Sequence, residues 1–218
     1  MTNEKFYTDR EEKANYITHG LGVLISIAAT VILINKAISS GNRGAIIAYG
    51  LFGIGMTICM GSSTIYHYVR DQVLKARLRH FDHASIYLLI AASYSPFTII
   101  LLRDAQFWGW LLFGIAWTTA IAGIALSFRK LSKNSHLKTA SYVMMGLVAL
   151  IAFKPSIEIA HAKNCMDVIY WLLGGGLFYI AGAVIYATAR REFVHAVFHL
   201  FVLLGLACHI TAAYLIPL

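Results

Sequence analysis

Apolar residues along the chain gather into seven long runs separated by short polar connections. A helix needs about 20 mostly apolar residues to cross the hydrocarbon of a bilayer. The fifth run is the weakest, because Lys154 and Pro155 cut it short, and a continuation toward Ile159 stays open. The pattern predicts seven transmembrane helices, at residues 16–37, 45–69, 81–102, 107–128, 139–153, 167–189 and 193–216.

Composition narrows the class of protein to a polytopic membrane protein. Of the 218 residues, 59% are apolar and 13% are charged, and the mean hydropathy is +0.68. Soluble domains have about 45–50% apolar and about 25% charged residues, so a soluble enzyme or a disordered chain is excluded. The three cysteines form an odd number and no CxxC occurs, which argues against a disulfide framework.

The lysines and arginines of the connections predict the orientation, because cytoplasmic loops are enriched in these residues. Thirteen lie on the side of the N-terminus and five on the other side. The N-terminus is therefore expected in the cytoplasm and the C-terminus outside. Residues 1–15 are expected to form a short cytoplasmic segment, and residues 16–218 a single seven-helix domain. The net charge of +8 is explained by these loops, so no nucleic-acid partner is expected.

Several ionisable residues fall at one depth of this predicted bundle, near its cytoplasmic face. Such residues are costly in a membrane and mark functional sites. His195 and His199 are spaced i, i+4 and share one face of the last helix, as in other helical metal sites. His67 is expected at the same depth and is the best third ligand for zinc. Asp82 is placed to hold or deprotonate a water, and Ser63 to bind that water or a substrate carbonyl.

A structural interpretation of the same residues stays open. Histidines near a membrane interface often extend toward water or hydrogen-bond to a backbone carbonyl, and one His-x-x-x-His pair is a weak signal. His209 is ten residues beyond His199, which is about 15 Å along a helix. It is therefore expected to lie outside the metal centre. The roles of the polar residues near the start of the first helix and of one neighbour of Asp82 stay undecided: Glu12, Asn15, His19 and His83.

At these residues the sequence resembles the bacterial hemolysin III-like branch of the progestin and adipoQ receptor family. The resemblance is carried by Glu12–Gly20, Ser63–His67, Phe81–Tyr87, Ser93–Phe97 and His195–His199. It implies a seven-helix bundle with zinc held by His67, His195 and His199, and with Asp82 and Ser63 beside the metal. Ala92, Ser95 and Phe198 depart mildly from the pattern expected for this branch, and none of them is a proposed ligand.

Two functions from different classes follow from the resemblance. The first is a zinc-dependent intramembrane hydrolase of lipid amide or ester bonds, because the family's receptors resemble ceramide-cleaving membrane hydrolases. The second is a non-enzymatic sensor or an oligomeric pore-forming cytolysin with a structural zinc, since bacterial members carry a haemolysin name. Membrane lipids are the expected partners in a bacterial plasma membrane, and the resemblance links the branch to membrane-lipid homeostasis. The sequence leaves the substrate and the oligomeric state open.

Overall fold

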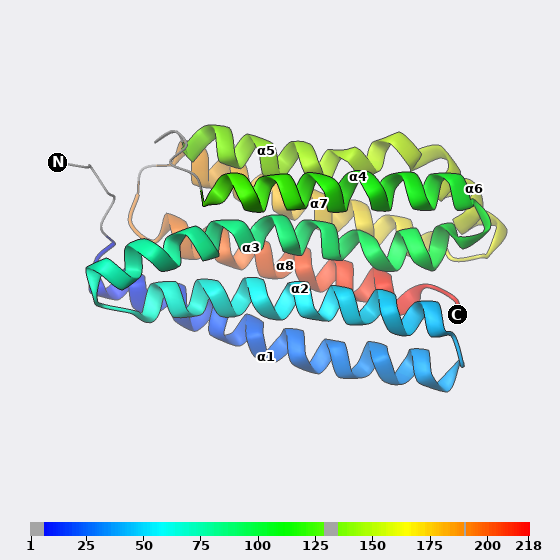
Figure 1. Ribbon diagram of the computed structural model, residues 1–218, viewed down its shortest axis with the longest axis horizontal. Helices are drawn as coiled ribbons and strands as arrows, with labels where there is room; N and C mark the ends of the chain where they lie inside the picture. Colours follow the sequence, from blue (N-terminus) through cyan, green and yellow to red (C-terminus); the bar gives the residue numbers. More distant parts are fainter. Residues whose placement is uncertain (1–6, 129–134, 190) are drawn as a thin grey trace.

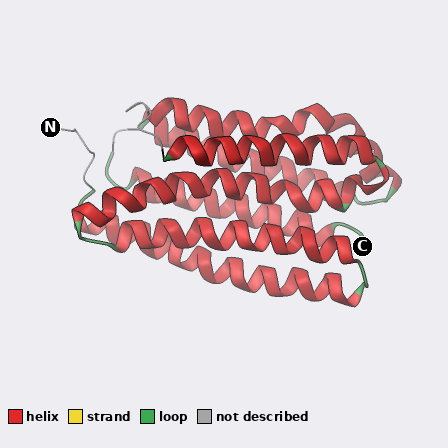
Figure 2. Ribbon diagram, in the orientation of Figure 1, coloured by secondary structure: helices red, strands yellow, loops and turns green. Residues whose placement is uncertain are grey.

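The computed structural model describes residues 7–128, 135–189 and 191–218, which fold into a bundle of long helices lying side by side (Figure 1). Apart from short connections, these described residues are helical, which confirms the all-α prediction (Figure 2). The elements are α1 (Asp9–Ser39), α2 (Arg43–Tyr68), α3 (Gln72–Ile99), the 3-10 turn η1 (Leu101–Asp104), α4 (Gln106–Ser127), α5 (Ser135–Leu147), the 3-10 turn η2 (Val148–Ala152), α6 (Phe153–Ala162), α7 (Met166–Thr188) and α8 (Val194–Leu215).

Six helical stretches are long and apolar enough to cross a membrane: α1, α2, α4, the stretch Leu137–Ala162 through α5 and α6, α7 and α8. Their outward faces carry large apolar side chains that no other part of the described chain covers. Leu24, Ile47, Ile121 and Leu177 are each more than 60% exposed. Such a surface would be unstable in water and is suited to lipid.

Helix α3 is as long as its neighbours but is not one of these six stretches. It packs between α2 and α4 (Figure 1). From Ser85 onward it buries polar side chains inside the bundle, among them Ser85, Ser93, Ser95 and Thr98. These residues lower its hydropathy, although they do not face lipid. The interior position of α3 therefore explains why composition separates it from the other helices.

The predicted starts of two helices that lead to the candidate site are wrong, because both helices begin earlier in the chain. Helix α1 begins at Asp9, inside the segment that was expected to precede it. Thr8 and Glu11 form a capping box there, in which each side chain accepts a hydrogen bond from the other residue's backbone N–H. Helix α3 begins at Gln72 rather than at residue 81, since the Asp71 carboxylate caps it through the N–H of Leu74.

The fifth apolar run also ends later than predicted. Helix α5 passes through η2 into α6, which runs on to Ala162. Pro155 lies in the first turn of α6, where a missing backbone N–H costs no helical hydrogen bond. The proline therefore does not end the membrane-capable stretch. Of the basic residues used for the orientation, some fall outside the described residues: Lys5, Arg129, Lys130, Lys133 and Arg190.

Helix α1 packs antiparallel to α2 and parallel to α8, and this arrangement positions the candidate site. Among the residues described, these helices are tied together at the end that carries the C-terminus, where Lys36 donates to the Ile216 carbonyl at 2.8 Å. The Tyr49 hydroxyl donates to the Ala213 carbonyl, also at 2.8 Å. The start of α1, the end of α2, the start of α3 and the start of α8 consequently meet at the opposite end of the bundle (Figure 1).

Candidate metal centre

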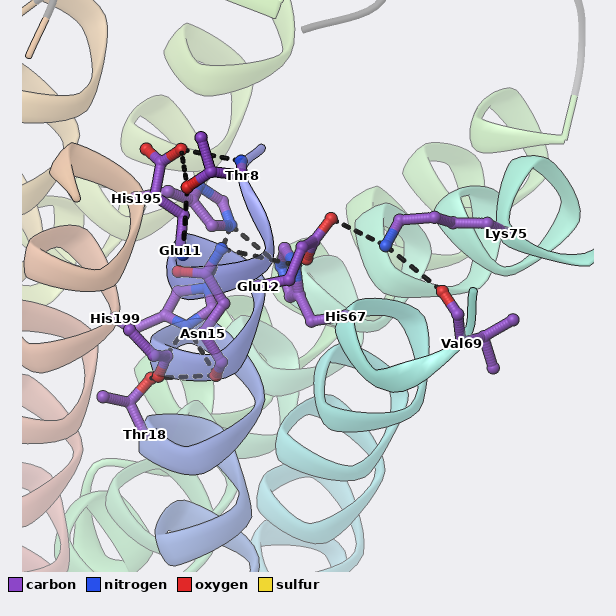
Figure 3. A network of polar contacts seen from close by, with 11 residues as sticks. Thr8, Glu11, Glu12, Asn15, Thr18, His67, Val69, Lys75, His195 and His199 are labelled. Carbon is purple, nitrogen blue, oxygen red and sulfur yellow. Dashed lines mark hydrogen bonds and ion pairs between the residues drawn. The ribbon is translucent and has the colours of Figure 1, made fainter. Parts of the chain in front are cut away.

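Three imidazole rings converge where the end of α2 meets the start of α8. The Nε2 atom of His195 lies 3.1 Å from Nε2 of His67 and 3.0 Å from Nε2 of His199. One ligand nitrogen from each ring lies within 4.8 Å of the other two (Figure 3). His67 and His199 are only 2% and 1% exposed, and His195 is partly buried. The structure thus brings together the three histidines that were predicted as metal ligands.

The start of α8 explains how its two histidines reach this place. The residue before the helix, Phe193, has a φ of 60°, a left-handed conformation that is unusual for a large side chain. Its backbone N–H donates to Oε1 of Glu11 on α1 at 3.0 Å. This contact holds the chain reversal against the first turn of α1. The i, i+4 spacing then directs both His195 and His199 toward α1 and α2.

Hydrogen bonds behind two of the rings fix which nitrogen faces the centre. Nδ1 of His67 lies 2.6 Å from Oε2 of Glu12, and Nδ1 of His199 lies 3.3 Å from the backbone carbonyl of Asn15. Carboxylate and carbonyl oxygens only accept, so both Nδ1 atoms carry the hydrogen. In the neutral rings both Nε2 lone pairs therefore point at Nε2 of His195. A single hydrogen on Nε2 of His195 can be donated to only one of these two lone pairs, whereas a metal cation can accept lone pairs from all three Nε2 atoms.

The geometry fits a metal ion bound by three nitrogens. Zn–N bonds of about 2.0–2.1 Å in a tetrahedral site place the nitrogens about 3.3 Å apart. The measured separations of 3.0 and 3.1 Å are close to this value. Imidazole suits zinc, copper, iron and nickel, so the donor set could hold a transition metal and is poorly suited to calcium or magnesium. Three protein ligands is also the number found in catalytic zinc sites.

The two other predicted site residues lie beside the three histidines. Ser63 is one helical turn before His67 on α2 and is 3% exposed. Asp82 is partly buried on α3, and its carboxylate interacts with the Ser63 hydroxyl and with His67. Among the described residues, however, Asp82 is not part of the group whose ligand atoms lie within 4.8 Å of one another. The structure therefore places Asp82 next to the centre rather than among its ligands.

His209 lies apart from the centre, as predicted. Its ring packs against the rings of Tyr179 and Phe97, at centroid distances of 5.2 and 6.3 Å. His19 is closer, because it is 4% exposed and its ring stacks on His199 with a centroid distance of 3.5 Å. The two rings lie nearly parallel, and among the described residues the ring nitrogens of His19 are not part of the group of converging ligand atoms.

The sequence analysis assigned no role to the residues of α1 that contact the imidazole rings of His67 and His199. Glu12 and Asn15 contact the Nδ1 sides of His67 and His199, and the Thr18 hydroxyl lies 3.2 Å from Nδ1 of His199. Their i, i+3 spacing on one helix face was a signal that could have indicated a shared role. Tyr7, which stacks on His195 at a centroid distance of 5.0 Å, gave no such signal. Burial raises the pKa of the Tyr7 phenol above its ordinary value.

The fold and the site define a multi-pass membrane protein with a histidine group at one end that can hold a metal ion. Comparison with known proteins gives the family: the chain belongs to the Haemolysin-III related family, which matches residues 7–210. This confirms the resemblance found in the sequence motifs, and the chain is accordingly a multi-pass bacterial membrane protein.

Relatives are similar over most of the chain. Hemolysin-3 of Bacillus cereus is 37% identical over 91% of this chain and 88% of its own length. The Hemolysin-3 homolog of Bacillus subtilis (strain 168) is 36% identical over 92% of both chains. The human monocyte to macrophage differentiation factor is 28% identical over 94% of this chain and 83% of its own length. The similarity therefore includes the segments that carry all three histidines.

Proposed function

We propose that the protein is a zinc-dependent intramembrane hydrolase that cleaves amide or ester bonds of lipids. The observation that carries the proposal is the convergence of three Nε2 atoms beside a carboxylate and a hydroxyl, those of Asp82 and Ser63. His67, His195 and His199 would hold the metal. Membrane lipids are the proposed substrates, since the outward faces of the helices are apolar.

The proposal includes seven spans, with α3 as the seventh, and a cytoplasmic N-terminus. Residues 16–218 would then form one membrane domain, and residues 1–15 its cytoplasmic segment. Support comes from the end of the bundle that holds the histidines. Among the described residues, Arg70 pairs with Asp9 and Lys75 with Glu12 at this same end, and Arg77 lies in the first two turns of α3. Basic residues of this kind favour the cytoplasmic side.

The residues beside the metal position have distinct proposed roles. Bound zinc supplies a Lewis acid that makes water a nucleophile at neutral pH. Asp82 accepts a proton from the water whose oxygen adds to the lipid carbonyl carbon. Ser63 donates a hydrogen bond that orients this carbonyl or the water. When the bond from the carbonyl carbon to the leaving nitrogen or oxygen breaks, Asp82 returns the proton to the leaving group.

The proposal is tested by metal analysis and a lipid-turnover assay on the same purified protein. One zinc per chain and hydrolysis of a ceramide, lysolipid or acyl-amide are expected. With zinc in excess, Asp82→Asn keeps the fold but loses about 100- to 10,000-fold in hydrolysis, because the amide cannot act as a base. Asp104→Asn is the control, since this carboxylate lies in η1 at the other end of the bundle.

Two results would contradict the proposal at different levels. A zinc-loaded wild type that turns over none of these lipids excludes the hydrolase and favours a sensor with a structural metal. Undiminished turnover by Asp82→Asn under zinc saturation leaves the hydrolase but removes Asp82 as its base.

A second function is favoured by the name of the relatives from Bacillus, Hemolysin-3. In this alternative the chain is a membrane cytolysin that assembles into an oligomeric pore. A dye-release assay with lipid vesicles separates the two functions. Leakage that Asp82→Asn leaves unchanged, without lipid turnover, supports the cytolysin, whereas lipid turnover without leakage supports the hydrolase.

A further inference from the structure

Behind His67, a chain of charged contacts connects three helices. Oε2 of Glu12 on α1 lies 2.6 Å from Nδ1 of His67 on α2. The other oxygen of the same carboxylate, Oε1, lies 2.7 Å from Nζ of Lys75 on α3. The side chains of Glu12 and Lys75 are only 14% and 15% exposed. Charges this well covered are costly unless each has a partner, and the carboxylate has one on each side.

We propose that Glu12 is a positioning residue that holds the His67 ring in the orientation and tautomer that direct its Nε2 lone pair at the metal. The proposal rests on the metal centre proposed above and assigns a residue of α1 to it. A neutral imidazole exchanges its hydrogen between two nitrogens unless a hydrogen bond selects one of them. At His67 the carboxylate at 2.6 Å makes this selection, because it can only accept.

Among the described residues, Asn15 is the only other residue of α1 whose side chain lies within hydrogen-bonding distance of this nitrogen, and its amide is farther away, at 3.4 Å. It cannot replace the charged acceptor. A carboxylate on the outer nitrogen also makes the imidazole a better electron donor at the inner nitrogen, as in other carboxylate–histidine–zinc arrangements. Removal of Glu12 should therefore weaken metal binding although this residue does not touch the metal position.

Lys75 distinguishes this role from that of a structural ion pair. Its ammonium also donates to the Val69 carbonyl at 3.3 Å, so it links α3 to the end of α2. If Glu12 and Lys75 serve only to join the helices, loss of either partner should have the same effect on the centre. If Glu12 acts on His67, loss of Lys75 leaves in place the 2.6 Å contact between Oε2 of Glu12 and Nδ1 of His67. It also removes a positive charge near the metal, so binding should not weaken.

The test measures the dissociation constant for Zn²⁺ of the full-length protein in detergent by competition with a chelator. Glu12→Ala should weaken binding by about 10- to 100-fold. Glu12→Gln should lose less, since its amide oxygen still accepts from Nδ1, and Lys75→Met should bind at least as tightly as wild type. Asp9→Asn is the matched control, because this carboxylate of the same helix pairs with Arg70 and is 82% exposed.

A double variant shows whether the effect passes through His67. In a His67→Ala background, Glu12→Ala should cause no further loss of affinity, because the ring on which Glu12 acts is absent. Equal affinities of Glu12→Ala and wild type would overturn the proposal. So would an equal loss in Lys75→Met, or a loss that persists in the His67→Ala background. A wild type that binds no metal would instead refute the proposed centre itself, so the two failures are distinguishable.

Discussion

Two histidines on α8 offer a matched pair for testing the centre. His199→Ala removes a nitrogen that lies 3.0 Å from Nε2 of His195. His209→Ala removes an imidazole from the same helix that packs on Tyr179 and Phe97, away from the converging nitrogens. Both variants lose the same atoms. Only the first is expected to lose metal.

The size of the effect follows from the number of ligands. Structural zinc sites with four ligands bind with about 10–16 kcal/mol, or about 2.5–4 kcal/mol for each ligand. Loss of His199 should therefore weaken binding about 100- to 1,000-fold. At free zinc 100 times the wild-type dissociation constant, bound metal stabilises the wild type by about 2.7 kcal/mol. A variant that binds 100-fold more weakly retains only about 0.4 kcal/mol under the same conditions.

The assay is thermal unfolding in detergent with and without Zn²⁺, together with chelator competition. Wild type and His209→Ala should both show the full zinc-dependent rise of the unfolding midpoint, whatever the midpoint without metal. His199→Ala should show almost none. A full rise in His199→Ala, or a lost rise in His209→Ala, would refute the assignment of the ligands.

Two further predictions concern topology and packing. A reporter fused after Leu218 should be found outside the cell, and a cytoplasmic reporter would contradict both the seven spans and the depth assigned to the histidines. Gly55→Ala should lower stability by about 1–3 kcal/mol, because a Cβ at this position of α2 would overlap the Cβ of Ala92 on α3. Gly61→Ala on the same helix meets open space and should be neutral or stabilising in the same thermal unfolding measurement, and equal losses in the two variants would contradict the packing argument.

Much of the helical framework could be predicted from the sequence, because hydrocarbon-crossing helices need long apolar runs. Helix α4 is at Gln106–Ser127, against a prediction of 107–128, and α7 is at Met166–Thr188, against 167–189. The early starts of α1 and α3 were missed, since their first turns are polar. Those turns are fixed by the caps of Thr8 and Asp71 rather than by hydrophobicity.

The sequence by itself determined the membrane class, the pairing of His195 with His199 by their helical spacing, and the depth that made His67 the third candidate. Depth says nothing about the rotation of a helix about its axis. Only the tertiary packing decided that Glu12 and Asn15 face the outer nitrogens of His67 and His199, while Asp82 lies beside the three Nε2 atoms instead of among them. The physical reason is that hydrophobic runs fix where a helix crosses the membrane, whereas contacts between helices fix which of its faces meets the centre.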